Sequence, residues 1–307
     1  MVQNPVAAAP ARSPDQAKTP AGTVVSAPGK ATAVTIQPNT RTIAVAVTDD
    51  GGSAVLFLPL DDLDAKPKRV PVPGRVERLA PDRGEEFLAT VPSEDLLVYL
   101  SPDDTIIGET SVEGAPVSVA NRGAQRLVAL RAAKAIDVLE YEQRTKTISG
   151  EMQSADQVLS VGDQAVVLDR LRSAVFEVDV DEGSIGVGLR AGQGATNAVT
   201  DRYDRVLVTD TRGGSLLAFS VDPLLLRQRY PVPGGVYGIA YDNARDLVWV
   251  TLTERNEVVG FDVAGGEPQE KRRFDTVSQP NSVTVDERTG RVVVASAAGE
   301  GIQVIEP

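Results

Sequence analysis

The residue types available for chemistry in this chain are restricted, because its 307 residues include neither histidine nor cysteine. Their absence removes Ser-His-Asp triads, imidazole acids and bases, thiolate nucleophiles, Cys/His zinc sites and disulfides together. Two kinds of chemistry remain. Oxygen donors can hold a hard cation, and arginines can hold an anion.

Oxygen donors for a Ca²⁺-type site are present at Asp156, Asn197 and Asn281, and Glu77 interrupts an otherwise apolar set of equivalent positions. A cation held by such residues would polarise a carbonyl and activate water, which requires no histidine. A metal-dependent lactonase or esterase is therefore the alternative function. These residues lie in four different repeats of the chain, and we expect them not to meet at one ion. We predict no catalytic residues, no metal and no cofactor.

Arginines recur at equivalent turns in the middle of the chain, at Arg131, Arg170, Arg212 and Arg255. A guanidinium can hold a carboxylate or a phosphate through two parallel hydrogen bonds, so an arc of arginines indicates an anion site. The alternative is that these side chains pair on a solvated surface with acids beside them. The neighbouring acids are Asp169, Asp210 and Glu254.

A second set of candidates is defined by position in a sequence repeat whose anchor residues are given below. Each candidate stands two residues before an anchor, and we expect these side chains to encircle the entrance of a central channel. The set contains Thr32, Arg75, Ala115, Asp156, Asn197, Tyr237 and Asn281. A small-molecule site needs only a few convergent polar groups. The alternative is that these positions are polar because the channel holds water. The predicted ligand-binding residues are Arg75, Asp156, Asn197, Tyr237 and Asn281 together with the four arginines.

A repeat of about 41 residues must position these side chains. Its anchors are Val34, Glu77, Val117, Val158, Val199, Ile239 and Val283. Each repeat holds short Val, Ile, Leu and Thr runs separated by Gly, Pro, Asp and Asn, as in one four-stranded blade. In the sixth repeat we expect strands at 236–242, 246–253, 256–263 and 270–277. The prediction is one all-β domain, a seven-bladed β-propeller over residues 21–307, with blade units starting near 32, 75, 115, 156, 197, 237 and 281.

The two ends of the chain are expected to meet in the last blade. The seventh repeat is one strand short, and residues 23–29 (TVVSAPG) are similar to the fourth strands that end at 69–74 and 229–234. An N-terminal strand in the last blade would cover two exposed sheet edges. Residues 1–20 contain four prolines among small polar residues, which predicts a flexible Ala/Pro-rich linker.

Charge and hydropathy limit the partners. The net charge of −12 repels nucleic-acid phosphates, so nucleic acid is not an expected partner. The sequence contains no run of 18 apolar residues, so no transmembrane span is predicted. The first residues also lack the pattern of a signal peptide. A signal sequence or lipid anchor of an exported protein would lie outside the given chain. We expect a monomer.

Three segments of the chain resemble the YVTN repeat of surface-layer-type propeller proteins, namely residues 249–262, 205–222 and 291–306. In WVTLTERNEVVGFD (249–262) an aromatic residue and valine are followed by Asn, alternating apolar residues and Asp. About half of the repeats carry this likeness. It implies a seven-bladed propeller, exported or at the bacterial cell surface, that serves as a binding platform.

Some relatives in this class are grouped with propeller lactonases. Gluconolactonase-type propellers use a comparable Glu/Asn/Asp set, but they usually have six blades. Any histidine-based mechanism of the lactonase-like relatives has no residue to carry it in this chain.

These observations predict a non-enzymatic, extracytoplasmic binding or scaffold protein of the cell envelope, whether periplasmic, secreted or lipid-anchored. Its channel mouth would engage an anionic small molecule, a glycan or a protein partner. The alternative is the Ca²⁺-dependent lactonase or esterase. Thermal stabilisation by calcium would discriminate the two.

Overall fold

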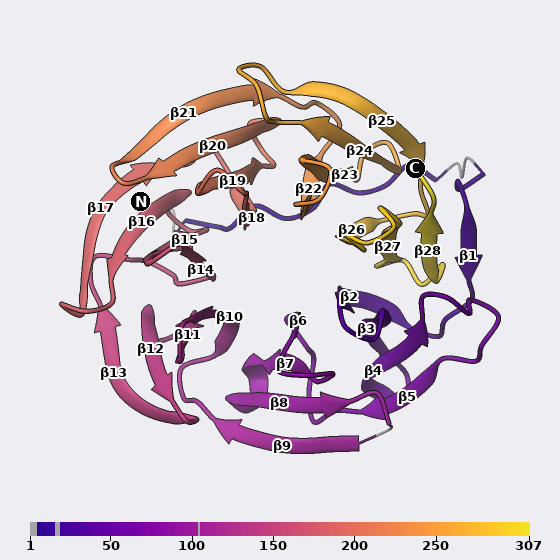
Figure 1. The fold of residues 1–307 in the computed structure, drawn as a ribbon, viewed down its shortest axis with the longest axis horizontal. Coiled ribbons are helices and arrows are strands. Elements are labelled where there is room, and N and C mark those ends of the chain that lie inside the picture. Colours follow the sequence, from indigo (N-terminus) through magenta and orange to yellow (C-terminus); the bar gives the residue numbers. More distant parts are fainter. Residues whose placement is uncertain (1–4, 16–18, 104) are drawn as a thin grey trace. The chain divides into compact units, whose positions relative to one another are not determined.

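The computed structural model describes residues 5–15, 19–103 and 105–307. Over these residues the chain forms seven four-stranded antiparallel sheets and one short 3₁₀ helix (Figure 1). Six of the sheets contain four consecutive strands in chain order. The predicted fold class, an all-β propeller with seven blades of four antiparallel strands, is confirmed.

The chain divides into two compact units. The first contains Met1–Pro10 and Glu113–Tyr237, and the second contains Ala11–Val112 and Gly238–Pro307. The first unit includes blades 3, 4 and 5, and the second includes blades 1, 2, 6 and 7.

The blades of the first unit follow one another without interruption. Blade 3 contains β10 (Pro116–Arg122), β11 (Gln125–Leu130), β12 (Ala135–Glu140) and β13 (Gln143–Ser149). Blade 4 contains β14 (Gln157–Val161), β15 (Gln164–Asp169), β16 (Ala174–Asp179) and β17 (Ser184–Arg190). Blade 5 contains β18 (Ala195–Thr200), β19 (Arg205–Asp210), β20 (Ser215–Val221) and β21 (Leu224–Pro231).

The second unit combines both ends of the blade sequence. Blade 1 contains β2 (Lys30–Gln37), β3 (Thr42–Asp49), β4 (Gly52–Pro59) and β5 (Lys68–Pro71). Blade 2 contains β6 (Arg78–Pro81), β7 (Phe87–Val91), the 3₁₀ helix η1 (Pro92–Glu94), β8 (Leu96–Ser101) and β9 (Thr105–Ser111). Blade 6 contains β22 (Val236–Asp242), β23 (Leu247–Leu252), β24 (Glu257–Asp262) and β25 (Gln269–Asp275). Blade 7 contains β26 (Pro280–Val285), β27 (Val292–Ser296), β28 (Ile302–Ile305) and β1 (Thr23–Val25).

The last blade is completed by the N-terminal strand, as predicted. Strand β1 pairs antiparallel with β28, with Thr23 opposite Val304 and Val25 opposite Ile302. This pairing covers the edge of β28, which would otherwise expose unpaired backbone groups.

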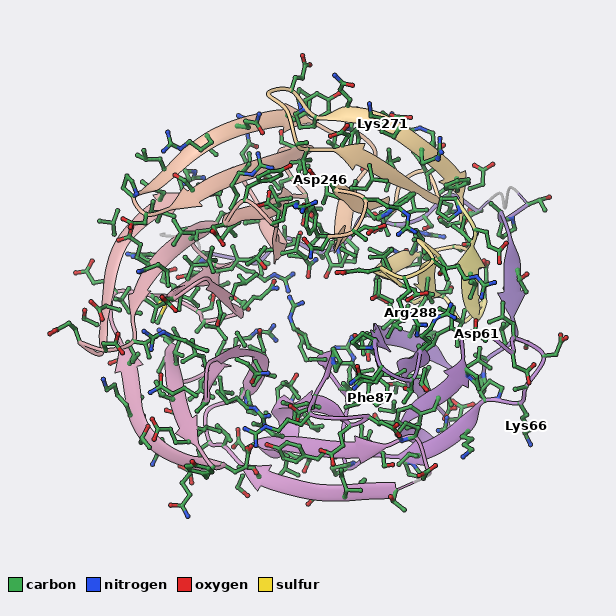
Figure 2. The ribbon with its side chains drawn as sticks, viewed as in Figure 1. Asp61, Lys66, Phe87, Asp246, Lys271 and Arg288 are labelled. Atoms are coloured by element: carbon green, nitrogen blue, oxygen red, sulfur yellow. The ribbon has the colours of Figure 1, made fainter. Side chains whose placement is uncertain are left out.

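The strands of a blade differ in burial, and the sequence pattern follows that difference. In β19, which pairs with β18 and β20 on its two edges, every residue from Val206 to Asp210 is buried. The outermost strand β21 is mostly exposed. Single side chains differ in the same way: Phe87 in β7 is fully buried, whereas Lys66 and Lys271 are exposed (Figure 2). The four strands predicted for the sixth repeat are confirmed within two residues.

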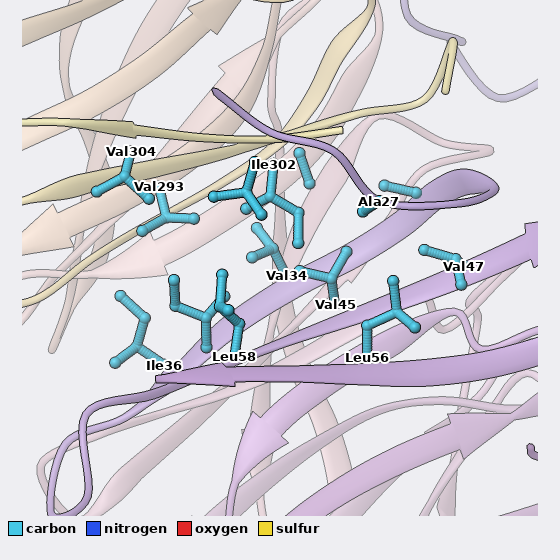
Figure 3. Close-up of a cluster of buried hydrophobic side chains, with 14 of the residues drawn as sticks. Ala27, Val34, Ile36, Val45, Val47, Leu56, Leu58, Val293, Ile302 and Val304 are labelled. Carbon is cyan, nitrogen blue, oxygen red and sulfur yellow. The ribbon is translucent and has the colours of Figure 1, made fainter. Parts of the chain in front are cut away.

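Aliphatic side chains join neighbouring blades inside each unit. Between blades 1 and 7, Val34, Val45 and Leu56 pack against Val293 and Ile302 (Figure 3). An equivalent cluster in the first unit joins blades 3 and 4. Burial of this apolar surface is the main force that holds the blades face to face.

Candidate functional site

Two of the predicted binding residues pair with each other. Asp156, which is 4% exposed, precedes β14 and accepts a hydrogen bond at 2.7 Å from Nε of Arg131 in the turn between β11 and β12. Its other carboxylate oxygen lies 2.5 Å from the Ser154 hydroxyl and accepts the main-chain N–H of Arg170 at 2.9 Å. Asp156, one of the residues predicted at the channel entrance, thus binds Arg131 and the backbone of Arg170, two members of the predicted arginine arc. Its role in these contacts is structural.

A second buried carboxylate organises blade 5. Asp210, which has no exposed surface, ends β19, and its Oδ1 accepts N–H groups of Gln193, Gly194 and Gly213 at 2.8–3.0 Å. A Cβ added at Gly192 or Gly213 would lie 1.9 Å from Oδ2 of Asp210. The Asp210 carboxylate therefore requires glycine at positions 192 and 213.

Asp169 has the equivalent role at the end of β15. Its Oδ2 accepts the N–H of Gln153 at 2.7 Å, and its Oδ1 accepts the N–H of Arg172 at 2.8 Å. The proposed pairing of Asp169 and Asp210 with arginine side chains beside them does not describe these two acids, because both carboxylates bind main-chain N–H groups. Asp169 and Asp210 both end the second strand of a blade, directly before a turn that contains arginine or glycine. This shared position is the sequence signal that could have indicated that they bind the backbone of the turns.

The guanidinium groups of Arg170 and Arg212 contact the N-terminal segment of the chain. Nη2 of Arg170 donates to the carbonyl oxygen of Ala8 at 2.7 Å, and Nη2 of Arg212 donates to that of Val6 at 2.7 Å. Ala8 is only 2% exposed. We name the surface made by residues 170–173, 192–194 and 211–214 the blade 4–5 rim.

The second unit also holds part of the N-terminal segment. The Ser13 hydroxyl donates to the carbonyl of Thr253 at 2.9 Å, and the Ser13 N–H donates to Oε1 of Gln279 at 3.1 Å. Nε2 of Gln279 donates to the carbonyl of Ala11 at 2.8 Å. Residues 6–13 are thus bound against the blades where the sequence predicted a flexible linker, because polar side chains of the turns satisfy their backbone groups. Residues 1–4 and 16–18 of that predicted linker lie outside the described residues.

Asn197 and Tyr237 meet through the backbone. Nδ2 of Asn197 donates to the carbonyl oxygen of Tyr237 at 3.1 Å, and the Thr209 hydroxyl donates to the same oxygen at 2.9 Å. The Asn197 amide and the Thr209 hydroxyl of blade 5 therefore both bind the backbone of Tyr237, the last residue of the first unit.

The predicted site residues of the second unit have separate surroundings. Arg75 is exposed and lies 3.8 Å from the Glu77 carboxylate, and Oδ1 of Asn281 accepts a hydrogen bond from Gln279 at 2.9 Å. Arg255 is exposed in the turn between β23 and β24.

Asp156, the acid of the predicted ring in the alternative metal site, is occupied by hydrogen bonds within the chain. Within the described ranges, no group of three Asp, Glu, His or Cys side chains is placed to hold an ion. Both carboxylate oxygens of Asp156 already accept hydrogen bonds, and a cation there would have to displace Arg131.

Blade 4 carries a cavity of about 610 Å³ that the sequence did not indicate. Arg172, Phe176 and Arg190 line it, and the Arg172 guanidinium carbon is 5.9 Å from the centre of the Phe176 ring. A Cβ at Gly188 would lie 2.3 Å from that ring, so the cavity depends on this glycine in the outer strand β17. Arg172, two residues after Arg170, lines this cavity.

Comparisons with known proteins support the fold. No family model and no curated protein sequence matches the chain. A chain of hydrazine synthase from Kuenenia stuttgartiensis has 16% identity and a TM-score of 0.76, over 93% of this chain and 98% of that one. Virginiamycin B lyase from Staphylococcus aureus has 12% identity and a TM-score of 0.75, over 92% and 96%. A chain of the mitotic checkpoint complex has 11% identity and a TM-score of 0.80, over 98% of both chains. At these identities the likeness establishes the seven-bladed propeller fold alone.

Proposed function

We propose that this protein is a non-enzymatic binding or scaffold protein whose blade 4–5 rim holds its ligand through Arg170 and Arg212. One observation carries the proposal. Two arginines from neighbouring blades each donate a 2.7 Å hydrogen bond to an oxygen acceptor outside the blades. The rim is thus built to hold paired oxygen acceptors, whether of an anionic small molecule, an acidic glycan or a protein partner.

The surroundings of these arginines support binding over catalysis. The acids nearest to them, Asp156, Asp169 and Asp210, are buried and accept hydrogen bonds from the chain itself. Each carboxylate therefore holds the chain around the rim, while the two guanidinium groups donate to acceptors outside the blades. An enzyme of the lactonase type would need an acid or a metal at the same surface.

The proposal includes a place in the cell. The YVTN-like segments and the proline-rich N-terminal stretch favour an envelope protein, periplasmic, secreted or lipid-anchored, that acts as a monomer. Among the described residues no helix is long and apolar enough to span a bilayer. Fractionation of the native host would test the location, and recovery in the cytosol alone would contradict it.

Calorimetry with an oligogalacturonate and a phosphoserine peptide tests the binding function. The wild-type chain should bind at least one of them, and Arg170→Ala combined with Arg212→Ala should abolish that binding. Arg227→Ala, which removes an exposed arginine from the outer strand β21 of the same unit, is the matched control. Calcium-restored hydrolysis of a lactone that is lost in Asp156→Ala would contradict the proposal and support the metal enzyme.

A further inference from the structure

The oxygen acceptors that the rim holds in this structure belong to a polypeptide backbone. Arg170 comes one residue after the end of β15 and Arg212 two residues after the end of β19, in the corresponding turns of two neighbouring blades. They bond to the carbonyls of residues 8 and 6, two positions apart in a segment that has neither helix nor strand. Recognition through main-chain carbonyls supplies affinity without reading side chains.

Selectivity enters at one position of the bound segment. Ala8 is 2% exposed, whereas Val6 is 71% exposed. A Cβ added at Gly194 would lie 2.8 Å from Cβ of Ala8, so the backbone of the rim approaches this side chain closely. The rim therefore admits alanine or glycine at the position of Ala8 and tolerates larger residues two positions earlier.

The bound segment is stiffened by its own sequence. Pro5 and Pro10 flank three consecutive alanines and Val6. Proline fixes its own φ and disfavours helix in the residue before it, so Pro5, Ala9 and Pro10 are already biased toward extended backbone in the free segment. Less conformational entropy is lost on binding than for an unrestricted peptide.

The rim is held in place by groups other than the segment it binds. The Arg170 N–H is bonded to Asp156, and the Gly194 N–H is bonded to Asp210 at 2.8 Å. Nε of Arg170 is buried and has no hydrogen-bond partner among the residues that the structure describes. If the segment leaves, the rim keeps its shape and the two guanidinium groups need new acceptors.

We propose that the blade 4–5 rim is a peptide-binding site for an extended, proline-flanked segment with alanine or glycine at the position of Ala8, and that residues 5–10 of this chain occupy it as a tethered, exchangeable ligand. The proposal rests on the binding function above and names the ligand class, a protein partner that presents such a segment. The tethered segment competes with that partner, so occupancy of the site is regulated in cis.

A tether sets the strength of this competition. A short flexible tether gives the tethered segment an effective concentration of about 1 mM. The apparent Kd of an added peptide is then multiplied by one plus the ratio of that concentration to the Kd of the segment. For a Kd of about 100 µM, the wild-type chain should bind the peptide about tenfold more weakly than a chain whose segment is released.

The test uses full-length chains and a capped synthetic peptide with the sequence of residues 5–13, titrated by calorimetry. Ala8→Lys places a long cation beside Arg170 and Arg212 and should release the tethered segment. This variant should bind the peptide about tenfold more tightly than the wild-type chain, and a second peptide carrying lysine at the position of Ala8 should not bind. An Ala8→Lys chain that shows no binding up to millimolar peptide would overturn the proposal.

Glycine variants distinguish a change at the binding site from a general effect on the fold. Adding Gly194→Ala to the Ala8→Lys chain should abolish peptide binding, whereas Gly265→Ala, where an added Cβ has no atom within 4 Å, should not. Unchanged binding in the Gly194→Ala chain would also overturn the proposal. Binding of the acidic glycan without binding of the peptide would refute this inference and leave the proposed function standing.

Discussion

Replacement of Asp210 by alanine should destabilise the protein strongly, because one buried carboxylate oxygen holds three main-chain N–H groups. Hydrogen bonds to a charged group contribute about 1.5–3 kcal/mol each, so the three bonds set an upper bound of about 5–9 kcal/mol. Water can enter the space left by the side chain and recover part of this loss. We expect a loss of about 4 kcal/mol in the free energy of unfolding, near the upper end for single substitutions.

The expected change in melting temperature follows from chain length. An unfolding entropy of about 2.1 cal/mol/K per residue over 307 residues converts 4 kcal/mol into a fall of about 6 °C. Asp210→Asn keeps a neutral acceptor at Oδ1 and should lose about half as much, since bonds to neutral groups are weaker. Asp163→Ala, which removes an exposed acid from the turn between β14 and β15, should change stability by less than about 0.5 kcal/mol.

Differential scanning calorimetry measures these losses, and amide hydrogen exchange locates them. Exchange should accelerate at Gln193, Gly194 and Gly213 in Asp210→Ala. If Asp210→Ala melts like Asp163→Ala, Asp210 does not hold the turns and the account of the rim's rigidity is wrong.

The remaining predictions concern the second unit. Val25→Glu buries a charge where β1 closes blade 7 and should lower the free energy of unfolding by about 3 kcal/mol, as followed by a thermal melt. Val24→Glu, at a side chain that is 40% exposed, should lower it little. Equal melting of the two variants would refute closure by β1. Burial alone would raise the pKa of Asp286, but hydrogen bonds from a threonine and an arginine outweigh it and lower the pKa, so its stabilisation is full above pH of about 4 and is lost as the pH falls further. The destabilisation caused by Asp286→Asn should therefore be largest near pH 7 and should shrink as the pH falls below about 4, and a loss that does not change with pH would contradict this. A Cβ at Gly260 would lie 3.0 Å from the fully buried ring of Trp249, so Gly260→Val should destabilise blade 6 by about 2 kcal/mol and shift the emission of this single tryptophan to the red; unshifted emission would show that the blade adapts.

The sequence predicted the fold because the repeat encodes it locally. Runs such as VYGIAYD and LVWVTL carry enough β-branched and aromatic residues to fix their strands, and the similarity of residues 23–29 to the fourth strands placed β1 correctly. Closure by β1 was predictable because the seventh repeat lacks a fourth strand, and β1 takes that place beside β28.

The site was only partly predictable, because repeat symmetry places side chains on a rim but does not reveal what they bond to. The predicted arc includes Arg170 and Arg212, but their acceptors are carbonyls of a segment whose composition predicted a linker. A backbone carbonyl has no sequence signature. Likewise, the glycines at 192 and 213 signalled turns but not the buried Asp210 that requires them.

The central claim is that the rim holds residues 6–8 through two arginines, and the reactivity of a single introduced thiol tests it most directly. The chain contains no cysteine, so Ala8→Cys and Ala9→Cys each supply one thiol, the first at a buried position and the second at an exposed one. The account predicts that the thiol at position 8 reacts with a maleimide at least ten times more slowly than the thiol at position 9. This difference should disappear when Arg170 and Arg212 are both alanine. Equal rates at the two positions in the otherwise wild-type chain, or a difference that survives loss of both arginines, would contradict the account.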